Sequence, residues 1–175
     1  MKNLFCFLSG LMIVFIMTSC KDKKRGKNYN DVIDESTSSF IKQGLEAGQT
    51  EIKASKIAEV NSKNSRIINF AKMMITDHAL AGDELEKIAI NNRIRGGDSI
   101  STDHQQFIGN ITALKGKAFD KAYIEMMVTE HQNAIKLFTT ASNDRIDEVQ
   151  RFAKKTLITL KTHLDSANVI ATSLK

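Results

Sequence analysis

Five side chains of the types that bind transition metals fall on the inward faces of predicted helices. They interrupt or border series of apolar residues spaced three or four positions apart, and they are Glu51, His78, Glu130, His131 and His163. Imidazole and carboxylate together form the ligand set for zinc, iron, manganese or copper. A carboxylate in an apolar interior is costly unless it is paired or ligated. The pattern therefore predicts a site for one Fe, Zn, Mn or Cu ion built from these five residues.

Four long helices must position these side chains. The apolar periodicity predicts long helices over residues 33–62, 65–93, 119–141 and 144–174, and a short helix over 102–114. The chain has no proline to interrupt them. Short turns make two antiparallel hairpins, and about 25 residues separate the hairpins, as in ferritin-like bundles. We predict an all-α, ferritin-like four-helix bundle with a short extra helix in the crossover between the second and third long helices.

The level of the five residues along the bundle supports a shared site, but two interpretations stay open. Each lies within about one helical turn of a helix midpoint. Di-metal sites in such bundles use Glu-x-x-His on two helices, whereas Ile75 precedes His78 by three residues and Leu160 precedes His163 by three. One ion is therefore favoured over a di-metal oxidase site. The other interpretation is a structural or partner-binding protein without a metal, in which a buried Glu–His network only fixes helix register.

Other polar residues are predicted to play local roles. His104 lies in the crossover and is expected to be exposed, and Asp120 is expected to be a first-turn charge at a helix N-terminus. Asp77 lies about 100° around its helix from His78, which makes it a poor additional ligand. Because no nucleophile elbow, phosphate loop or dinucleotide fingerprint is present, we predict that the protein is not an enzyme. The net charge of +5 comes without a nucleic-acid motif, so nucleic acid is not an expected partner.

The first residues have the pattern of an exported lipoprotein. A lysine at position 2 precedes about 14 apolar residues and then the sequence Thr18-Ser19-Cys20, which resembles a lipobox. We predict a signal peptide over residues 1–19, a lipid anchor on Cys20 with a flexible tether over 20–32, and the bundle over 33–175. The predicted location is the bacterial outer membrane, facing periplasm or exterior. An uncleaved N-terminal membrane anchor is the alternative, and the protein partner and oligomeric state are not predicted.

Three ordered motifs resemble those of one family. They are FAKMMITDH at residues 70–78, FDKAYIEMMVTEH at 119–131 and LKTHL at 160–164. Together with Glu51 they resemble the bacterial domain of unknown function 4142, a ferritin-like group of exported envelope proteins, over residues 38–174. The sequence departs from that family at Glu130, where Asp is usual, and at Ile158-Thr159, where the family has proline. The resemblance implies a four-helix fold with a shared Asp/Glu–His set and no established activity.

Overall fold

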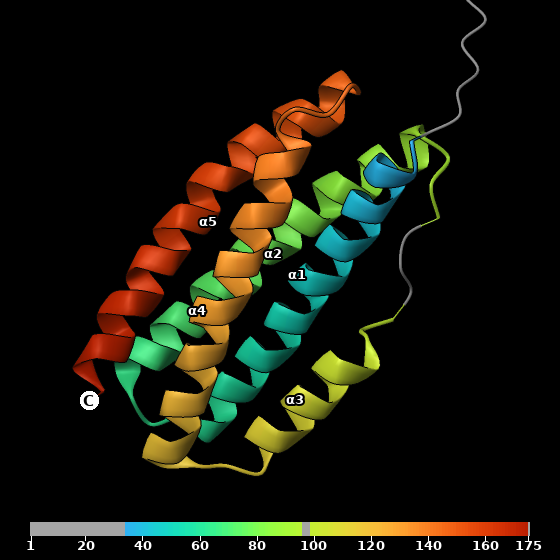
Figure 1. Cartoon of the computed structure of the whole chain (residues 1–175). Coiled ribbons are helices and arrows are strands. Elements are labelled where there is room, and N and C mark those ends of the chain that lie inside the picture. Colours follow the sequence, from blue (N-terminus) through green and yellow to red (C-terminus); the bar gives the residue numbers. More distant parts are fainter. Residues whose placement is uncertain (1–33, 96–98, 175) are drawn as a thin grey trace, which may run out of the picture. The chain divides into compact units, whose positions relative to one another are not determined.

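The computed structural model describes residues 34–95 and 99–174, and within them every regular element is a helix (Figure 1). The helices are α1 (Glu35–Asn61), α2 (Ser65–Asn91), α3 (Thr102–Thr112), α4 (Gly116–Ala141) and α5 (Asp147–Ser173). The all-α prediction is confirmed, with bounds that differ from the expected ones by at most three residues. The predicted signal peptide, Cys20 and the tether lie outside the described residues. Among the described helices, none has the length and hydropathy needed to cross a membrane.

Two antiparallel hairpins form the bundle. The short connections after α1 and after α4 turn the chain back, so that α1 pairs with α2 and α4 pairs with α5 (Figure 1). The hairpins pack through contacts of α1 with α4 and of α2 with α5. The crossover containing α3 returns the chain along α1 and α4, which makes α2 and α4 run in the same direction. This is the ferritin-like connectivity that the spacing of the predicted helices implies.

Local sequence signals set the starts of three helices. The side chains of Asp34, Asn64 and Ser101 accept hydrogen bonds from backbone N–H groups in the first turns of α1, α2 and α3. Each bond satisfies a donor that has no partner inside the helix, which typically contributes about 1 kcal/mol. The start of α4 differs from the prediction because the helix begins at Gly116 rather than 119. The prediction that Asp120 is a first-turn charge is therefore wrong. Asp120 is an inward-facing residue that is 4% exposed.

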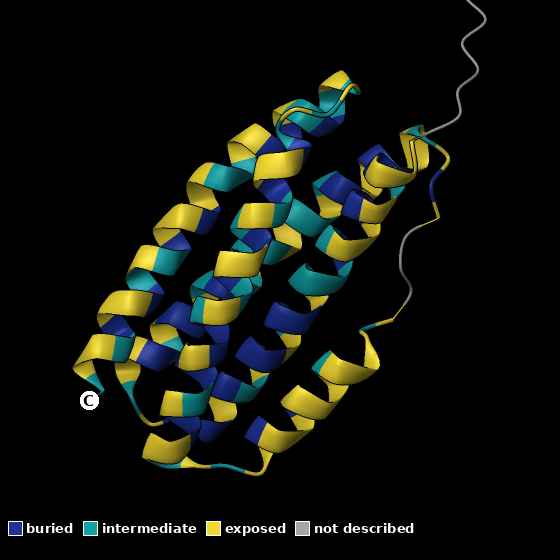
Figure 2. Cartoon of the chain, viewed as in Figure 1, coloured by how far each residue is buried: buried dark blue, intermediate teal, exposed yellow. Residues whose placement is uncertain are grey.

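The interior consists of two apolar clusters with a polar level between them. One cluster contains Ile67, Met74 and Tyr123, and the other contains Ile41, Leu85 and Phe138. Glu51, His131 and His163 are buried between these clusters, where Figure 2 shows the buried faces of the helices turned inward. The apolar clusters on both sides exclude water and fix the helix register. They therefore position a small group of polar side chains in a low-dielectric interior.

Candidate metal centre

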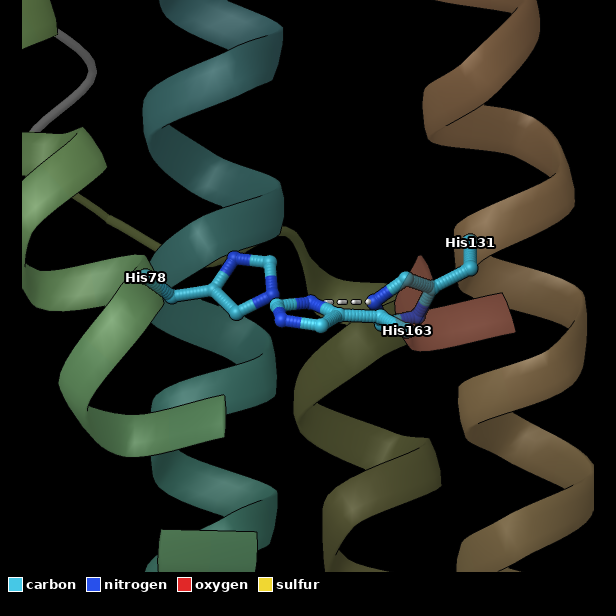
Figure 3. A group of neighbouring side chains, drawn as sticks. All are labelled: His78, His131 and His163. Atoms are coloured by element: carbon cyan, nitrogen blue, oxygen red, sulfur yellow. Dashed lines mark hydrogen bonds between the residues drawn. The ribbon is translucent and has the colours of Figure 1, made fainter. Parts of the chain in front are cut away.

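Three imidazoles from three helices meet at the polar level. His78 extends from α2, His131 from α4 and His163 from α5 (Figure 3). Each contributes one nitrogen to a set whose members all lie within 4.8 Å of one another. The three ring centroids form a nearly equilateral triangle, with separations of 5.6, 5.5 and 5.4 Å. Three rings arranged evenly around one point have the geometry of imidazoles that share a central ligand.

The proton of the His131 imidazole is assigned by its backbone partner. Nδ1 of His131 lies 2.8 Å from the carbonyl oxygen of Met127, one turn earlier in α4. A carbonyl only accepts, so Nδ1 donates its N–H to Met127. In the neutral ring, Nε2 then carries a lone pair. Burial lowers the pKa of His131 from its ordinary value, and the neighbouring His78 adds to that effect, outweighing the attraction of Glu51. His131 is therefore the neutral tautomer with Nε2 free to bind.

The proton of the His163 imidazole is assigned in the same way. Nε2 of His163 lies 2.9 Å from Oδ2 of Asp77, a half-exposed carboxylate on α2. The carboxylate accepts the N–H of Nε2, which leaves the lone pair of the neutral ring on Nδ1. Burial lowers the pKa of His163, and the neighbouring His78 and His131 act in the same direction, outweighing the hydrogen bond and the charge of Asp77. Asp77 thus orients this ring and fixes its tautomer.

The two lone pairs face each other. Nε2 of His131 and Nδ1 of His163 lie 3.3 Å apart, the separation marked by the dashed line in Figure 3. Two acceptors at this distance repel unless a proton or a cation lies between them. A proton would create a buried imidazolium, which the lowered pKa values of both rings disfavour. Two nitrogens bound to a tetrahedral zinc ion lie about 3.3–3.4 Å apart, because each Zn–N bond is about 2.0–2.1 Å. The spacing fits a metal ion.

Glu51 supplies a negative charge beside the imidazoles. Its Oε2 lies 2.8 Å from Nε2 of His78, and its Oε1 lies 3.7 Å from Nδ1 of His131. Although the first distance is short, the groups are not aligned as donor and acceptor. Both carboxylate oxygens and His78 Nε2 are buried and find no hydrogen-bond partner among the described residues. These buried polar atoms lie close together without hydrogen bonds to one another, which is how ligands are arranged around a shared ion.

The charges at this level are distributed unevenly. Burial opposes ionisation of Glu51, but the adjacent imidazoles, His78 foremost, more than compensate and lower the pKa of its carboxyl. Burial likewise opposes the charged form of His78, yet the adjacent Glu51 carboxylate raises the pKa of that imidazole. The result is one charged Glu51–His78 pair beside two neutral imidazoles. A carboxylate and neutral imidazoles are the forms that bind metal ions.

Four of the five predicted ligands lie together, and Glu130 lies apart from them. The sequence pattern placed Glu130 in the middle of the inward stripe of α4 and His131 at its edge. In the structure His131 is fully buried and Glu130 is half-buried at the flank. The reason is that the apolar series of α4 centres on Tyr123, Met127 and Ala134, which puts His131 in phase. Glu130, the preceding residue, is rotated by about 100° around the helix axis and faces α3.

Glu130 instead belongs to a second polar group around His104. Nδ1 of His104 lies 2.7 Å from Oε1 of Glu46 on α1, and Nε2 lies 3.5 Å from Oε2 of Glu130 on α4. Glu46 also accepts the backbone N–H of Ser101, 2.8 Å away. The expectation that His104 is a plain exposed residue is therefore wrong, because its side chain is 25% exposed and links α3 to two bundle helices.

Two orienting groups were not predicted from the sequence. Metal-binding histidines usually donate their other ring N–H to a carboxylate or a backbone carbonyl. Asp77 and the Met127 carbonyl have this role for His163 and His131. Asp77 lies beside His78 in sequence, on the flank of α2 that faces α5. The sequence signal that could have identified Asp77 is its place next to the inward-facing His78, at the edge of the face that α2 turns toward another helix.

Comparisons with known proteins agree with this fold. The family model described as domain of unknown function DUF4142 matches residues 24–170. No curated protein matches the sequence. A solved structure described as a DUF305 fragment from Deinococcus radiodurans superposes with a TM-score of 0.73 at 14% identity, over 80% of this chain and 97% of that chain. That likeness concerns the fold alone. The family match spans most of the sequence, including every helix that supplies the imidazoles, and the chain belongs to the DUF4142 family.

Proposed function

We propose that the bundle binds one divalent transition-metal ion through His78, His131 and His163, with Glu51 as the adjoining carboxylate. The observation that carries this proposal is the 3.3 Å approach of two lone-pair nitrogens, His131 Nε2 and His163 Nδ1. Hydrogen bonds to Met127 and Asp77 occupy the other nitrogens of these rings. Three imidazoles suit zinc, copper, iron and manganese, and the negative charge of Glu51 offsets part of the ion's charge.

The number of donors favours one ion. The three imidazoles supply one nitrogen each, and the Glu51 carboxylate lies beside them, 2.8 Å from Nε2 of His78. A two-ion site in such a bundle takes carboxylates from four helices, and Glu130 is directed to His104 instead. The proposed role is to hold a single ion in the cell envelope for storage, buffering or redox protection.

Metal loading of the purified protein tests this proposal. Zinc, iron(II) and copper(II) are added in turn, excess metal is removed on a desalting column, and bound metal is measured by elemental analysis. The expected result is one ion per chain for at least one metal and loss of binding in His131→Leu. His104→Gln is the matched control, because His104 lies outside the imidazole triangle. Failure of all three metals to bind, or equal binding by His131→Leu, contradicts the proposal and leaves a network that fixes helix register.

We also propose that the protein is an envelope lipoprotein anchored through Cys20. The support is the sequence pattern of a basic start, an apolar run and Thr18-Ser19-Cys20. A diacylated cysteine gives stable attachment where a single chain does not. Labelling of producing bacteria with a palmitate analogue is expected to mark the wild type and Cys6→Ala but not Cys20→Ala. Equal labelling of Cys20→Ala contradicts the lipid anchor. If residues 1–19 remain on the mature protein, an uncleaved N-terminal membrane anchor is favoured instead.

A further inference from the structure

A small cavity adjoins the imidazole triangle. Its volume is about 30 Å³, and Glu51 and His78 form its polar end. The remaining walls come from residues about one to three turns away along the four long helices and are mostly apolar, including Leu85, Phe138 and Leu160. A cavity needs about 10–15 Å³ to hold one water molecule. This space is therefore large enough for a molecule of one or two non-hydrogen atoms.

At the polar end of the cavity, Glu51 and His78 form an ion pair but leave three buried atoms without a hydrogen bond in the described chain. The Glu51 side chain is 1% exposed and both its oxygens lack a hydrogen-bond partner in the described chain, as does Nε2 of His78. A buried polar atom without a partner is destabilising and calls for a ligand, an ion or water. The two residues that carry these atoms line a space that side chains leave empty.

Cavity-lining residues of α1 and α2 are partly exposed to solvent along the seam between these two helices. Small residues line it, and Gly48 and Gly82 come from the two facing helices. A Cβ atom on Gly48 would lie 4.0 Å from Nδ1 of His78, whereas one on Gly82 would meet nothing within 4 Å. The His78 side chain keeps 11% exposure. Because glycine has no side chain, these two positions leave space along the seam that a larger side chain would fill.

We propose that the ion bound by the three imidazoles keeps an exchangeable coordination position facing this cavity, where it takes a small uncharged ligand such as a diatomic gas. This inference rests on the proposed metal site. Three protein ligands leave a tetrahedral ion one position for an exogenous molecule. The apolar walls and the negative charge of Glu51 favour a neutral ligand over an anion. Glu51 is adjacent to that position as an acceptor for a bound water or hydroxide.

Nitric oxide binding to the iron(II)-loaded protein tests the open position. Nitric oxide is a neutral diatomic probe, and its complexes with non-haem iron(II) have a distinctive electron paramagnetic resonance signal. Under anaerobic conditions the wild type is expected to give this signal in proportion to its bound iron. Bound iron without a nitrosyl signal overturns this inference alone and indicates that Glu51 closes the site as a fourth ligand. Failure to bind iron, zinc or copper overturns the metal site and this inference together.

Substitution at the seam tests the route. Gly48→Leu is expected to retain one iron per chain and to weaken nitric oxide binding by about tenfold or more, because the new side chain occupies the cavity. Gly109→Leu, on the exposed face of α3 where a Cβ has open space, is the matched control and is expected to match the wild type. If Gly48→Leu does not fold, Gly82→Leu provides the same obstruction from α2. Undiminished nitric oxide affinity in a folded seam variant overturns the proposed route.

Discussion

Nε2 of His131 and Nδ1 of His163 face each other across 3.3 Å, although hydrogen bonds elsewhere on both rings leave each of these nitrogens with a lone pair. This relationship joins the fold to its proposed chemistry. The helices α4 and α5 place the rings together, and their partners fix the tautomers. Two acceptors held at the edge length of a metal coordination tetrahedron are better explained by a cation than by a direct bond.

The orienting carboxylate should affect metal affinity without being a ligand. In Asp77→Ala, His163 loses the acceptor that lies 2.9 Å from its Nε2, so its ring is no longer held in the binding tautomer. Loss of such a partner typically weakens metal binding by about 10- to 100-fold. Competition with a chromophoric chelator measures this change. Asp83→Ala on the exposed face of the same helix is the control. Equal affinities in the two variants contradict the assigned role.

Removing His78 should lower the stability of the metal-free protein much more than removing His163. His78→Leu leaves the buried Glu51 carboxylate without its main positive partner, and breaking a buried pair in this way costs about 3–5 kcal/mol. His163→Leu removes the partner of only one carboxylate, Asp77, which is 36% exposed and can be solvated by water. It also removes the repulsion between the two facing lone pairs. Urea unfolding of both variants measures the difference.

The double variant Glu51→Leu/His78→Leu is the control for this comparison. Because it removes both charges, it should recover a large part of the stability lost in His78→Leu. A loss of stability in His163→Leu as large as that in His78→Leu would contradict the asymmetry and favour a uniform register-fixing network.

Metal binding should release a proton at mildly acidic pH. Ligands must be deprotonated, and Glu51 raises the pKa of His78 above the ordinary value of 6.5, whereas burial lowers the pKa values of His131 and His163 below it. Near pH 6.5 only His78 therefore carries a proton to lose. Affinity should rise by about tenfold per pH unit until the pH passes the raised pKa of His78, and then level off. Calorimetry in buffers of different ionisation enthalpy measures the released proton, and release of two or more near pH 6.5 would contradict the assignment.

The second polar group should couple pH to the docking of α3. Burial lowers the pKa of His104, but its bond to Glu46 and the charge of Glu130 prevail and raise it. A raised histidine pKa stabilises the folded protein fully below the unfolded value of 6.5, and that stabilisation is lost as pH rises through the folded pKa. His104→Gln should therefore cost about 0.2–1 kcal/mol at about pH 6 and less at about pH 9.

Hydrogen exchange of the α3 amides is the readout for that prediction. Faster exchange in His104→Gln than in the wild type is expected at the lower pH, with convergence as pH rises. The exposed substitution Asp103→Asn in the same helix is the control. A difference between wild type and His104→Gln that does not change with pH would contradict the link.

The sequence permitted accurate prediction of the features that depend on periodicity. The helices, their order and the crossover follow from apolar spacing and the absence of proline. Glu51 and His163 are inward because apolar neighbours one turn away on both sides fix their phase. These residues lie in the middle of long helices, where a phase error is smallest.

Adjacent polar residues could not be ranked by periodicity alone. Glu130 and His131 are about 100° apart on α4, and the broad apolar stripe accommodates either of them. Packing against α3 and the bundle decides the phase, so that His131 is buried and Glu130 meets His104. The tautomers depend on contacts between α2 and α5 and on a backbone carbonyl, which no spacing pattern records.

Anomalous diffraction at the zinc edge from crystals of the zinc-loaded protein locates the ion that the three imidazoles are proposed to bind. We expect one strong peak between the three rings, about 2.0–2.1 Å from His131 Nε2, His163 Nδ1 and a nitrogen of His78. Zinc found only at surface carboxylates, with no peak between these imidazoles in a fully loaded protein, would contradict it.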